Sequence, residues 1–355
     1  MRALIAMSGG VDSSVAAKRM IEQGYDCVGC TMRLYDGPDA VGTSSRACCS
    51  LDDVEDARSV ARRLGMPYYV FNFKEEFAEK VIQKFADCYR QGKTPNPCID
   101  CNRYMKFSAL YRRAQVLDCE VIVSGHYARV ERAGDRYQLK KAVYTEKDQS
   151  YVLYCMSQEE LAHTLFPLGG LSKAQVRELA REGGFVNSDK PDSQDICFAP
   201  DGDYAKVVRQ YGGDPGEGPF VDTAGKVLGT HKGIIHYTVG QHRGLGLGYH
   251  EKLYVCRISP ENNAVVLGHA EDLMRTEVLV EDFNWVSIAP TDEPFRCTAK
   301  IRYRGKESPA TAYPEENGRL RLVFDEDQRA PAPGQAAVLY EGDLLLGGGT
   351  ICVEA

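Results

Sequence analysis

ALIAMSGGVDSSVAAKRM, residues 3–20, decides the fold of the N-terminal part of the chain. Its apolar run at Leu4 and Ile5 predicts a buried strand, and residues 15–20 predict a helix. Residues 8–14 then form a strand-to-helix turn, in which two glycines let a ligand approach the backbone closely. Backbone N–H groups, serine hydroxyls and a helix N-terminus all favour an anion at such a turn. The stretch therefore predicts a phosphate cradle.

Apolar runs alternate with helical stretches over the first part of the chain. We expect strands at residues 3–7, 27–35, 68–73 and 121–126, and a helix that begins at Leu51 and stops before Gly65. This alternation predicts an α/β fold, with a Rossmann-like parallel sheet covered by helices on both faces. Ligands of such sheets bind at the C-terminal ends of the strands. The turn at residues 8–14 and the segment Ser124-Gly125-His126 should therefore contact the same nucleotide.

The sequence changes character twice after this predicted sheet. Residues 213–248 are rich in glycine and strand-like pairs, which suits a small central β-rich domain. Further on, alternating strands and hairpin signals such as AAVLYEGDLLLGG, residues 336–348, predict a C-terminal β-barrel. We therefore expect three domains, over residues 1–200, 201–270 and 271–355.

Composition narrows the class of protein. With 355 residues, 43% of them hydrophobic and 26% charged, the chain is typical of a globular protein of more than one domain. The sequence has neither a secretory leader nor an apolar run of membrane-spanning length, so we expect a cytoplasmic protein with no membrane partner. Thirteen cysteines then favour thiol or metal chemistry over a disulfide scaffold. The net charge of −7 disfavours nucleic-acid binding only weakly, because a local basic patch can override it.

The turn at residues 8–14 differs from a Walker loop. It has no Gly-Lys-Ser/Thr, which disfavours a γ-phosphate hydrolase, and Asp12 instead predicts a Mg²⁺ site beside the phosphates. Ser8-Gly9-Gly10-Val11-Asp12-Ser13 resembles the PP-loop of the ATP pyrophosphatases, which cleave ATP between its α- and β-phosphates by adenylating a substrate oxygen. The resemblance implies that the turn holds the leaving pyrophosphate.

Two further segments carry candidate reactive cysteines. In GKTPNPCIDCNRYMKF, residues 92–107, two prolines keep the backbone extended before Cys98 and Cys101. At this CxxC spacing one thiol can attack and the other resolve, or both can bind a metal. In KPDSQDICFAP, residues 190–200, Cys197 follows a helix that we expect to end near Gly183. A lone loop cysteine is by itself more often structural than catalytic.

The order of motifs along the chain resembles the tRNA-specific 2-thiouridylases, which thiolate the wobble uridine. SGGVDSS, TPNPCIDCN, SGHYAR, KDQSYVLY, DSQDICF and YTVGQHRGLGLG cover nearly the entire sequence in the family's order. The resemblance implies that ATP adenylates the uridine O2 and that a persulfide sulfur then displaces AMP. It makes Cys197 the cysteine that receives a persulfide from a sulfur-donor protein, and Cys101 the nucleophile that releases the sulfur and closes a transient disulfide with Cys197.

The same resemblance implies two sets of binding residues. The ATP contacts would be Ala6, Met7, Ser8, Gly9, Gly10, Val11, Asp12, Ser13, Met32 and Gly125. The contacts to tRNA or to the target base would be Asn96, Pro97, Cys98, His126, Lys147, Asp148, Gln149, Arg302, Tyr303 and Gln335.

Cys98 departs from the pattern of several relatives, which have an aspartate suited to a general base at this position. The substitution puts that role in doubt. It also opens an alternative, because Cys98, Cys101 and Cys197 together supply three thiolates that could hold an iron–sulfur cluster with one open iron. Between the two routes we favour the persulfide.

A basic stretch near the C-terminus offers a surface for RNA. Within RCTAKIRYRGK, residues 296–306, basic or polar side chains share one parity and mostly apolar ones the other. A strand here would have a basic face that suits a phosphate backbone, although a solvated outer face of a barrel strand would look the same. Recognition should target unpaired anticodon-loop bases, where the uridine can turn out into a pocket.

Two other functions fit part of the sequence. An ATP pyrophosphatase that amidates a small substrate would need the PP-loop but neither Cys101 nor Cys197. An RNA-binding protein with a metal-bound CxxC would leave residues 8–14 unexplained. We assign no role to Cys48 and Cys49. The remaining cysteines are predicted to be small core residues, namely Cys27, Cys30, Cys88, Cys119, Cys155, Cys256, Cys297 and Cys352.

Overall fold

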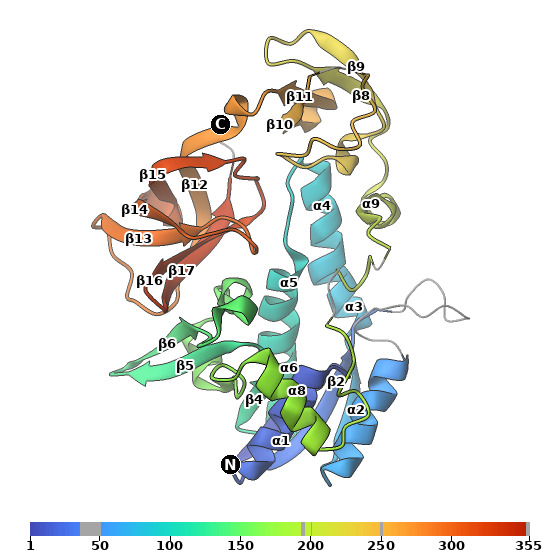
Figure 1. Cartoon of the computed structure of the whole chain (residues 1–355), viewed down its shortest axis with the longest axis vertical. Coiled ribbons are helices and arrows are strands. Elements are labelled where there is room, and N and C mark those ends of the chain that lie inside the picture. The colour runs from blue at the N-terminus through green and yellow to red at the C-terminus, as the bar shows by residue number, and fades with distance from the viewer. Residues whose placement is uncertain (36–50, 193–195, 200, 249–250, 353–355) are drawn as a thin grey trace.

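The structure is a computed structural model that describes residues 1–35, 51–192, 196–199, 201–248 and 251–352 (Figure 1). Cys48 and Cys49 lie outside these residues. The N-terminal domain contains a parallel sheet with the strand order β3-β2-β1-β4-β7. Its strands are β1 (Arg2–Ala6), β2 (Asp26–Arg33), β3 (Tyr68–Asn72), β4 (Val121–Ser124) and β7 (Thr164–Leu165). The predicted parallel α/β sheet is therefore confirmed.

Helices cover both faces of this sheet. One face packs against α1 (Val11–Glu22), α2 (Leu51–Arg63) and α8 (Lys173–Glu182). The other packs against a helical run of α3 (Lys74–Phe77), η1 (Ala78–Gln83) and α4 (Lys84–Arg90), and a second run of α5 (Pro97–Asp100), η2 (Cys101–Ala109) and α6 (Leu110–Val116). We call the cluster under these two runs, which includes Leu4, Phe77, Phe85 and Leu110, the helical-run core.

Strand β1 shows why the sequence forms two cores. Ala3 and Ile5 point into the core beneath α1 and α8, and Leu4 points into the helical-run core, because side chains alternate across a strand. Leu4 and Ile5 are completely buried, and burial of each such side chain contributes about 1.5–3 kcal/mol. The packing fixes where β1 ends, and hence where the turn at residues 8–14 begins.

The central domain is a small sheet with the order β10-β11-β8-β9. Its elements are α9 (Tyr204–Gly212), β8 (Gly218–Val221), β9 (Val227–His231), β10 (Tyr254–Ser259) and β11 (Ala264–Gly268). Phe220 of β8 is completely buried and stacks edge-on against His231 and Tyr237. The expected β-rich central domain is thus confirmed.

The C-terminal part is a closed antiparallel barrel, as predicted. The order β12-β15-β14-β13-β16-β17 closes on itself through a β12–β17 pairing. The strands are β12 (Met274–Trp285), β13 (Phe295–Lys300), β14 (Ser308–Pro314), β15 (Leu320–Arg329), β16 (Ala336–Glu341) and β17 (Leu344–Ile351). A hairpin of the N-terminal domain, β5 (Ala128–Ala133) and β6 (Arg136–Lys141), extends the barrel sheet by pairing with β17 (Figure 1).

Shorter helical turns complete the described chain. They are η3 (Thr145–Lys147), η4 (Ser150–Leu153), α7 (Gln158–Ala162), η5 (Ile234–His236), η6 (Pro260–Asn262), η7 (Glu271–Leu273) and η8 (Glu316–Gly318). Over the described ranges, no helix combines the length and the apolar character needed to cross a membrane.

The predicted strand over residues 296–306 is wrong in its second half. Strand β13 ends at Lys300, and the chain then turns so that the Gly305 N–H donates to the Arg302 carbonyl. The guanidinium of Arg302 donates to the carbonyls of Arg329 and Ala330, which holds the turn against the end of β15. The basic face therefore extends only through Arg296 and Lys300, and Arg302 and Tyr303 project from a turn.

Candidate active site

The turn after β1 is closed by its own serines. The Ser8 N–H donates to Ser13 Oγ at 3.1 Å, and the hydroxyls of Ser13 and Ser14 donate to the Gly10 carbonyl at 3.1 and 3.0 Å. Gly10 is the N-cap of α1 and has no side chain to block the helix N-terminus. All three serine hydroxyls thus take part in hydrogen bonds within the turn, and the helix N-terminus that follows it favours an anion.

Gly9 is the position in the turn that admits no other residue. Its φ is +73°, and a Cβ built there would lie 2.3 Å from the carbonyl oxygen of Asp53 at the start of α2. Gly125 at the end of β4 is similarly confined, because a Cβ there would lie 2.9 Å from the Asp12 carbonyl carbon and the Ser13 nitrogen. The turn therefore lies directly against the end of β4, as contact of both segments with one nucleotide would require.

A distant segment clamps the turn from outside. Asn187 is buried, and its Nδ2 donates to the Gly9 carbonyl at 2.9 Å and to Ser14 Oγ at 3.0 Å. Lys190 Nζ lies 3.4 Å from the same Gly9 carbonyl and 2.6 Å from carboxylate oxygens of Asp53 and Asp56. Sequence reasoning missed both residues, since nothing in the spacing links them to Gly9, which lies 178 positions before Asn187 and 181 before Lys190.

Helix α8 supplies the lysine that the turn lacks. Lys173 Nζ lies 2.7 and 2.9 Å from the two carboxylate oxygens of Asp12, and its side chain is only 15% exposed. The hydroxyl of Tyr127 donates to Asp12 at 2.7 Å. Burial, and next the charge of Asp12, raise the pKa of Tyr127, so this hydroxyl keeps its proton. Lysine is a common phosphate ligand, which makes Lys173 a further candidate for the nucleotide site.

Asp12 alone fits the predicted Mg²⁺ only in part. Its charge is already balanced by Lys173, and the described ranges contain no group of three or more His, Cys, Asp or Glu side chains that could hold a metal ion. Mg²⁺ beside a nucleotide is usually held by one or two carboxylates together with phosphate oxygens and water. Asp12 therefore suffices as the protein's ligand only when ATP phosphates supply the others.

The other predicted ATP contacts lie around the same strand ends. Ala6 ends β1, Met32 lies near the end of β2, and the side chains of Met7 and Val11 are buried in the core beneath α1. The backbone of Met7 is already used, because its N–H donates to the Cys30 carbonyl and its carbonyl accepts from Thr31 Oγ1. Met7 and Val11 thus line the site without offering side-chain polar groups.

His126 is buried behind the end of β4. Its Nδ1 lies 2.7 Å from Ser124 Oγ, and its Nε2 lies 3.5 Å from Lys106 Nζ. Burial, helped by the charge of Lys106, holds the pKa of His126 well below 6.5. The imidazole is therefore neutral at pH 7, so any contact it makes to RNA is a hydrogen bond and not a charge pair.

Cys98 and Cys101 lie at the start of the helical run of α5 and η2. Asn96 caps this run, because its Oδ1 accepts the Cys98 N–H at 3.1 Å, and Pro97 occupies the first helical position. The spacing of three places both cysteines on one side of the helix. Cys98 is exposed and Cys101 is half-buried against the helical-run core.

Cys197 borders that same core from another segment. It is half-buried, and the neighbouring Phe198 packs edge-on against Phe77 and Phe85 at 5.9 and 5.2 Å between ring centres. Cys101 and Cys197 are thus thiols at the edge of one cluster. Within the described part of the chain, however, Cys98, Cys101 and Cys197 do not form a group arranged to hold a metal.

Most other cysteines follow the prediction of core residues. Those that are buried are Cys27, Cys30, Cys119, Cys155 and Cys297, and those that are half-buried are Cys88, Cys256 and Cys352. Burial raises the pKa of Cys155 and of Cys297 to about 12, so these two thiols stay protonated at neutral pH.

The predicted tRNA contacts at residues 147–149 mostly hold their own loop. Asp148 accepts from the Ala142 N–H at 2.9 Å and from the Ser150 hydroxyl at 2.7 Å. Gln149 Oε1 accepts the Tyr127 N–H at 3.0 Å. Lys147 is 44% exposed and pairs with Asp192 at 2.8 Å. Lys147 is therefore the member of this set that can reach a phosphate.

The barrel brings Tyr303 to the cysteine segment. Tyr303 is 37% exposed, hydrogen-bonds Gln149, and lies close enough to Asp148 and Cys98 for their charges to act on it. Burial, and next Asp148, raise its pKa. The barrel also docks through Gln335, whose Nε2 donates to the Thr94 carbonyl at 2.7 Å. Gln335 therefore holds the barrel to the segment that precedes Cys98.

A chain of contacts consequently leads from the turn after β1 to Tyr303. Tyr127 donates its hydroxyl to Asp12 and its N–H to Gln149, Gln149 hydrogen-bonds Tyr303, and Tyr303 lies within electrostatic range of Cys98. The residues come from α1, from the loop after β4, from the loop at 145–150 and from the barrel turn. The fold thus links Asp12, Gln149 and Tyr303, three of the predicted site residues, from distant parts of the chain.

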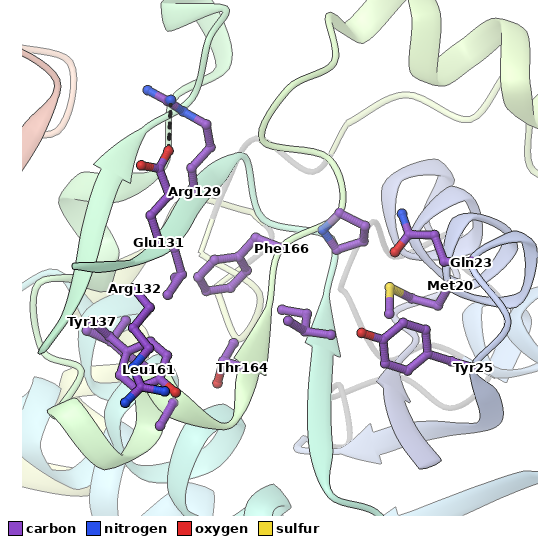
Figure 2. Close-up of a pocket in the computed structure, with 14 residues that line it drawn as sticks. Met20, Gln23, Tyr25, Arg129, Glu131, Arg132, Tyr137, Leu161, Thr164 and Phe166 are labelled. Atoms are coloured by element: carbon purple, nitrogen blue, oxygen red, sulfur yellow. Dashed lines mark hydrogen bonds and ion pairs between the residues drawn. The ribbon is translucent and has the colours of Figure 1, made fainter. Parts of the chain in front are cut away.

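Two cavities lie apart from this chain of contacts. One, of about 410 Å³, is lined by Met20, Tyr25, Arg129, Tyr137 and Phe166 among others (Figure 2). Figure 2 also shows Arg129 paired with Glu131 at its edge. The other, of about 400 Å³, lies between Asn96, Arg103 and Glu281, where α5 meets the barrel. Of the predicted site residues, only Asn96 lines either one.

Comparison with known proteins places all three parts of the chain in one family. Residues 1–201 match the family model described as "tRNA methyl transferase HUP domain", residues 205–269 the "tRNA methyl transferase PRC-barrel domain", and residues 275–351 the "Aminomethyltransferase beta-barrel domain". The tRNA-specific 2-thiouridylase MnmA of Clostridioides difficile (strain 630) is 49% identical over 99% of this chain and 98% of its own length. That of Acetivibrio thermocellus is 48% identical over 99% of both. The chain belongs to the tRNA-specific 2-thiouridylase family.

Membership of this family confirms the resemblance seen in the sequence. The descriptions of the family models name methyl transferases, whereas the relatives that match nearly the entire chain are named for thiolation. The names of relatives at this identity carry more weight than the description of a domain. Among solved structures, a 4-thiouridine synthetase–RNA complex with bound ATP is 19% identical over 59% of this chain and 50% of its own, with a TM-score of 0.38, too low to bear on function.

Proposed function

We propose that this chain is an ATP-dependent sulfurtransferase that replaces O2 of the wobble uridine of tRNA by sulfur. The observation that carries the proposal is the chain of contacts from Asp12 through Tyr127 and Gln149 to Tyr303, which lies within electrostatic range of Cys98. It leads from the turn proposed to hold ATP phosphates to the segment that carries Cys101, and the proposed reaction needs both a nucleotide and a nucleophilic thiol. The names of the whole-length relatives support the same reaction.

The first half of the reaction would use the turn at residues 8–14. The uridine O2 attacks the α-phosphorus of ATP, the α–β phosphoanhydride bond breaks, and pyrophosphate leaves with the bonding electrons. The N–H groups at the start of α1 and the ammonium of Lys173, which contacts Asp12, would stabilise the negative charge that develops on the leaving group. Mg²⁺, held by Asp12 together with the phosphates, would add to that stabilisation.

The second half would use the two half-buried thiols. A sulfur-donor protein loads Cys197 as a persulfide. The Cys101 thiolate attacks the inner sulfur, the sulfur–sulfur bond breaks, and the outer sulfur leaves with the electron pair and adds to C2 of the adenylated uridine. AMP departs with the former O2, and a disulfide between Cys101 and Cys197 is left for a thiol reductant. The common core that borders both cysteines supports their pairing, and the pair must move to meet.

Thiolation through an iron–sulfur cluster is the second route. The one feature that favours it is Cys98. At this position an aspartate could act as a general base in the persulfide route, whereas a cysteine adds a third thiolate for a cluster. A cluster would require Cys98, Cys101 and Cys197 to leave their described positions and converge.

The direct test uses anaerobically purified protein, unmodified tRNA, Mg-ATP and a persulfide donor. We expect 2-thiouridine in the digested tRNA, none with Cys101→Ser or Cys197→Ser, and an unchanged yield with Cys88→Ser, a half-buried cysteine that serves as control. ATP cleavage to AMP without thiolation would favour an amidating pyrophosphatase. Methylated uridine in a parallel mixture that also contains a methyl donor would overturn the proposal in favour of the reaction in the domain descriptions. Thiolation that depends on bound iron would replace the persulfide route by the cluster route.

A further inference from the structure

Asp192 holds two lysines at once. Its Oδ1 lies 2.6 Å from Lys173 Nζ, and its Oδ2 lies 2.8 Å from Lys147 Nζ. Arg177 is more distant, at 3.7 Å. Burial acts to raise the pKa of Asp192, but the hydrogen bonds from Lys147 and Lys173 hold it below its ordinary value. Asp192 is therefore a carboxylate at neutral pH, shared by two ammonium groups.

The two lysines belong to different parts of the site. Lys173 also contacts both carboxylate oxygens of Asp12, at the turn proposed to hold the phosphates of ATP. It is the first residue of α8, which Ser172 and Gln175 fix through a capping box. Lys147 ends the turn η3, in the set predicted to contact tRNA. Asp192 is the residue through which these two cations meet.

We propose that Asp192 is a positioning residue that couples the nucleotide site to the tRNA site. The inference rests on the proposed function, because it assigns Lys173 to ATP phosphates and Lys147 to an RNA phosphate. Either ligand draws one ammonium away and leaves Asp192 with the other. Both ligands together leave the carboxylate with Arg177, at 3.7 Å, as its remaining cation among the described residues, and a partly buried carboxylate without a close cation is costly.

The sign of the coupling follows from this competition. The free energy of binding of the second ligand is less favourable, because this ligand removes the last close cation from Asp192. ATP therefore weakens the binding of tRNA, and by linkage tRNA weakens the binding of ATP by the same factor. A carboxylate shared in this way makes the affinity for each substrate depend on whether the other is bound, although the two substrates do not touch.

The test measures the Kd for tRNA by filter binding, with and without a saturating ATP analogue that has a methylene group between its α- and β-phosphates. For the wild type we expect the analogue to raise this Kd by about five-fold, a typical coupling. For Asp192→Asn we expect the ratio of the Kd with the analogue to the Kd without it to fall to about one, because the shared charge is gone. Asp192→Glu should restore most of the ratio. Asp189→Asn is the matched control, since Asp189 is an exposed carboxylate of the same segment that pairs with Arg181 alone among the described residues.

Lys147→Met removes the shared contact from the other side and should also bring the ratio to about one. A ratio that persists in Asp192→Asn, or a wild-type ratio of one or below, would overturn the coupling. Circular dichroism of each variant separates lost coupling from lost folding. Wild-type protein that binds neither tRNA nor the analogue would overturn the proposed function itself, and the coupling with it, so the two failures are distinct.

Discussion

The ammonium group of Lys173 lies 2.7 Å from Oδ1 and 2.9 Å from Oδ2 of Asp12, although 161 positions separate the two residues in the sequence. The turn at residues 8–14, which is predicted to bind phosphate, therefore has a lysine beside it, supplied by α8. This ion pair fixes the cation at the N-terminus of α1, where the dipole already favours negative charge.

Removal of this cation should impair ATP cleavage. For Lys173→Met we expect kcat/KM for AMP formation to fall by about 100-fold, because a preorganised charge near the leaving pyrophosphate is lost. Lys18→Met is the control, since Lys18 pairs with Glu22 on the same α1 helix, more than one helical turn from residues 8–14. Steady-state assays of AMP release check the prediction, and equal rates for the two variants would contradict it.

Gly9 should be far less replaceable than another glycine of the same backbone conformation. Gly9 and Gly24 have φ of +73° and +84°, but a Cβ at Gly24 meets nothing within 4 Å, whereas one at Gly9 meets the Asp53 carbonyl at 2.3 Å. We expect Gly24→Ala to cost about 1 kcal/mol of unfolding free energy and to retain activity. Gly9→Ala should displace the turn and abolish ATP cleavage. Urea unfolding and AMP release measure both effects, and comparable behaviour of the two variants would refute this role of Gly9.

Cys98 discriminates between the two sulfur routes. The persulfide route needs only Cys101 and Cys197, so Cys98→Asp should form 2-thiouridine within a few-fold of the wild type. The side chain is exposed, and the substitution should leave the fold intact. Nucleoside mass spectrometry together with an iron assay on the same sample gives the answer. Complete loss of thiolation along with loss of bound iron would favour the cluster.

Acid should destabilise the protein partly through His126. The folded-state pKa of His126 is held below 6.5 by burial, so between the two pKa values the unfolded state binds more protons. The stability it contributes is present above about pH 6.5 and is lost as the pH falls towards the folded-state pKa, at up to about 1.4 kcal/mol per pH unit. His126→Gln should flatten this dependence in urea unfolding at pH 7, 6 and 5. The exposed His269→Gln should not, and parallel curves for wild type and His126→Gln would contradict the assignment.

Local pattern was enough to predict the elements that position the turn. The strand at Leu4 and Ile5, the turn with Gly9, and a helix that begins at Leu51 all depend on neighbours in sequence, and the structure has them. Periodicity also predicted the parallel sheet and the barrel, because it reports which faces of each element are buried.

Contacts between distant segments could not be predicted in this way. Lys173, Asn187 and Lys190 reach the turn from more than 160 positions away, and their local sequence reads as an ordinary helix start and a polar loop. The alternation over residues 296–306 failed for the same reason. The alternating pattern continues past Lys300, but the strand does not. Hydrogen bonds from Arg302 to the end of β15 stabilise a turn after Lys300 instead.

The most direct test of the account follows the oxygen that sulfur replaces. A tRNA transcript made with uridine labelled with ¹⁸O at O2 is incubated with the protein, Mg-ATP and a persulfide donor, and the AMP is analysed by mass spectrometry. Adenylation of O2 predicts one labelled oxygen in AMP for each 2-thiouridine formed. Unlabelled AMP in the presence of 2-thiouridine would show that the oxygen leaves by another path and would contradict the proposed mechanism.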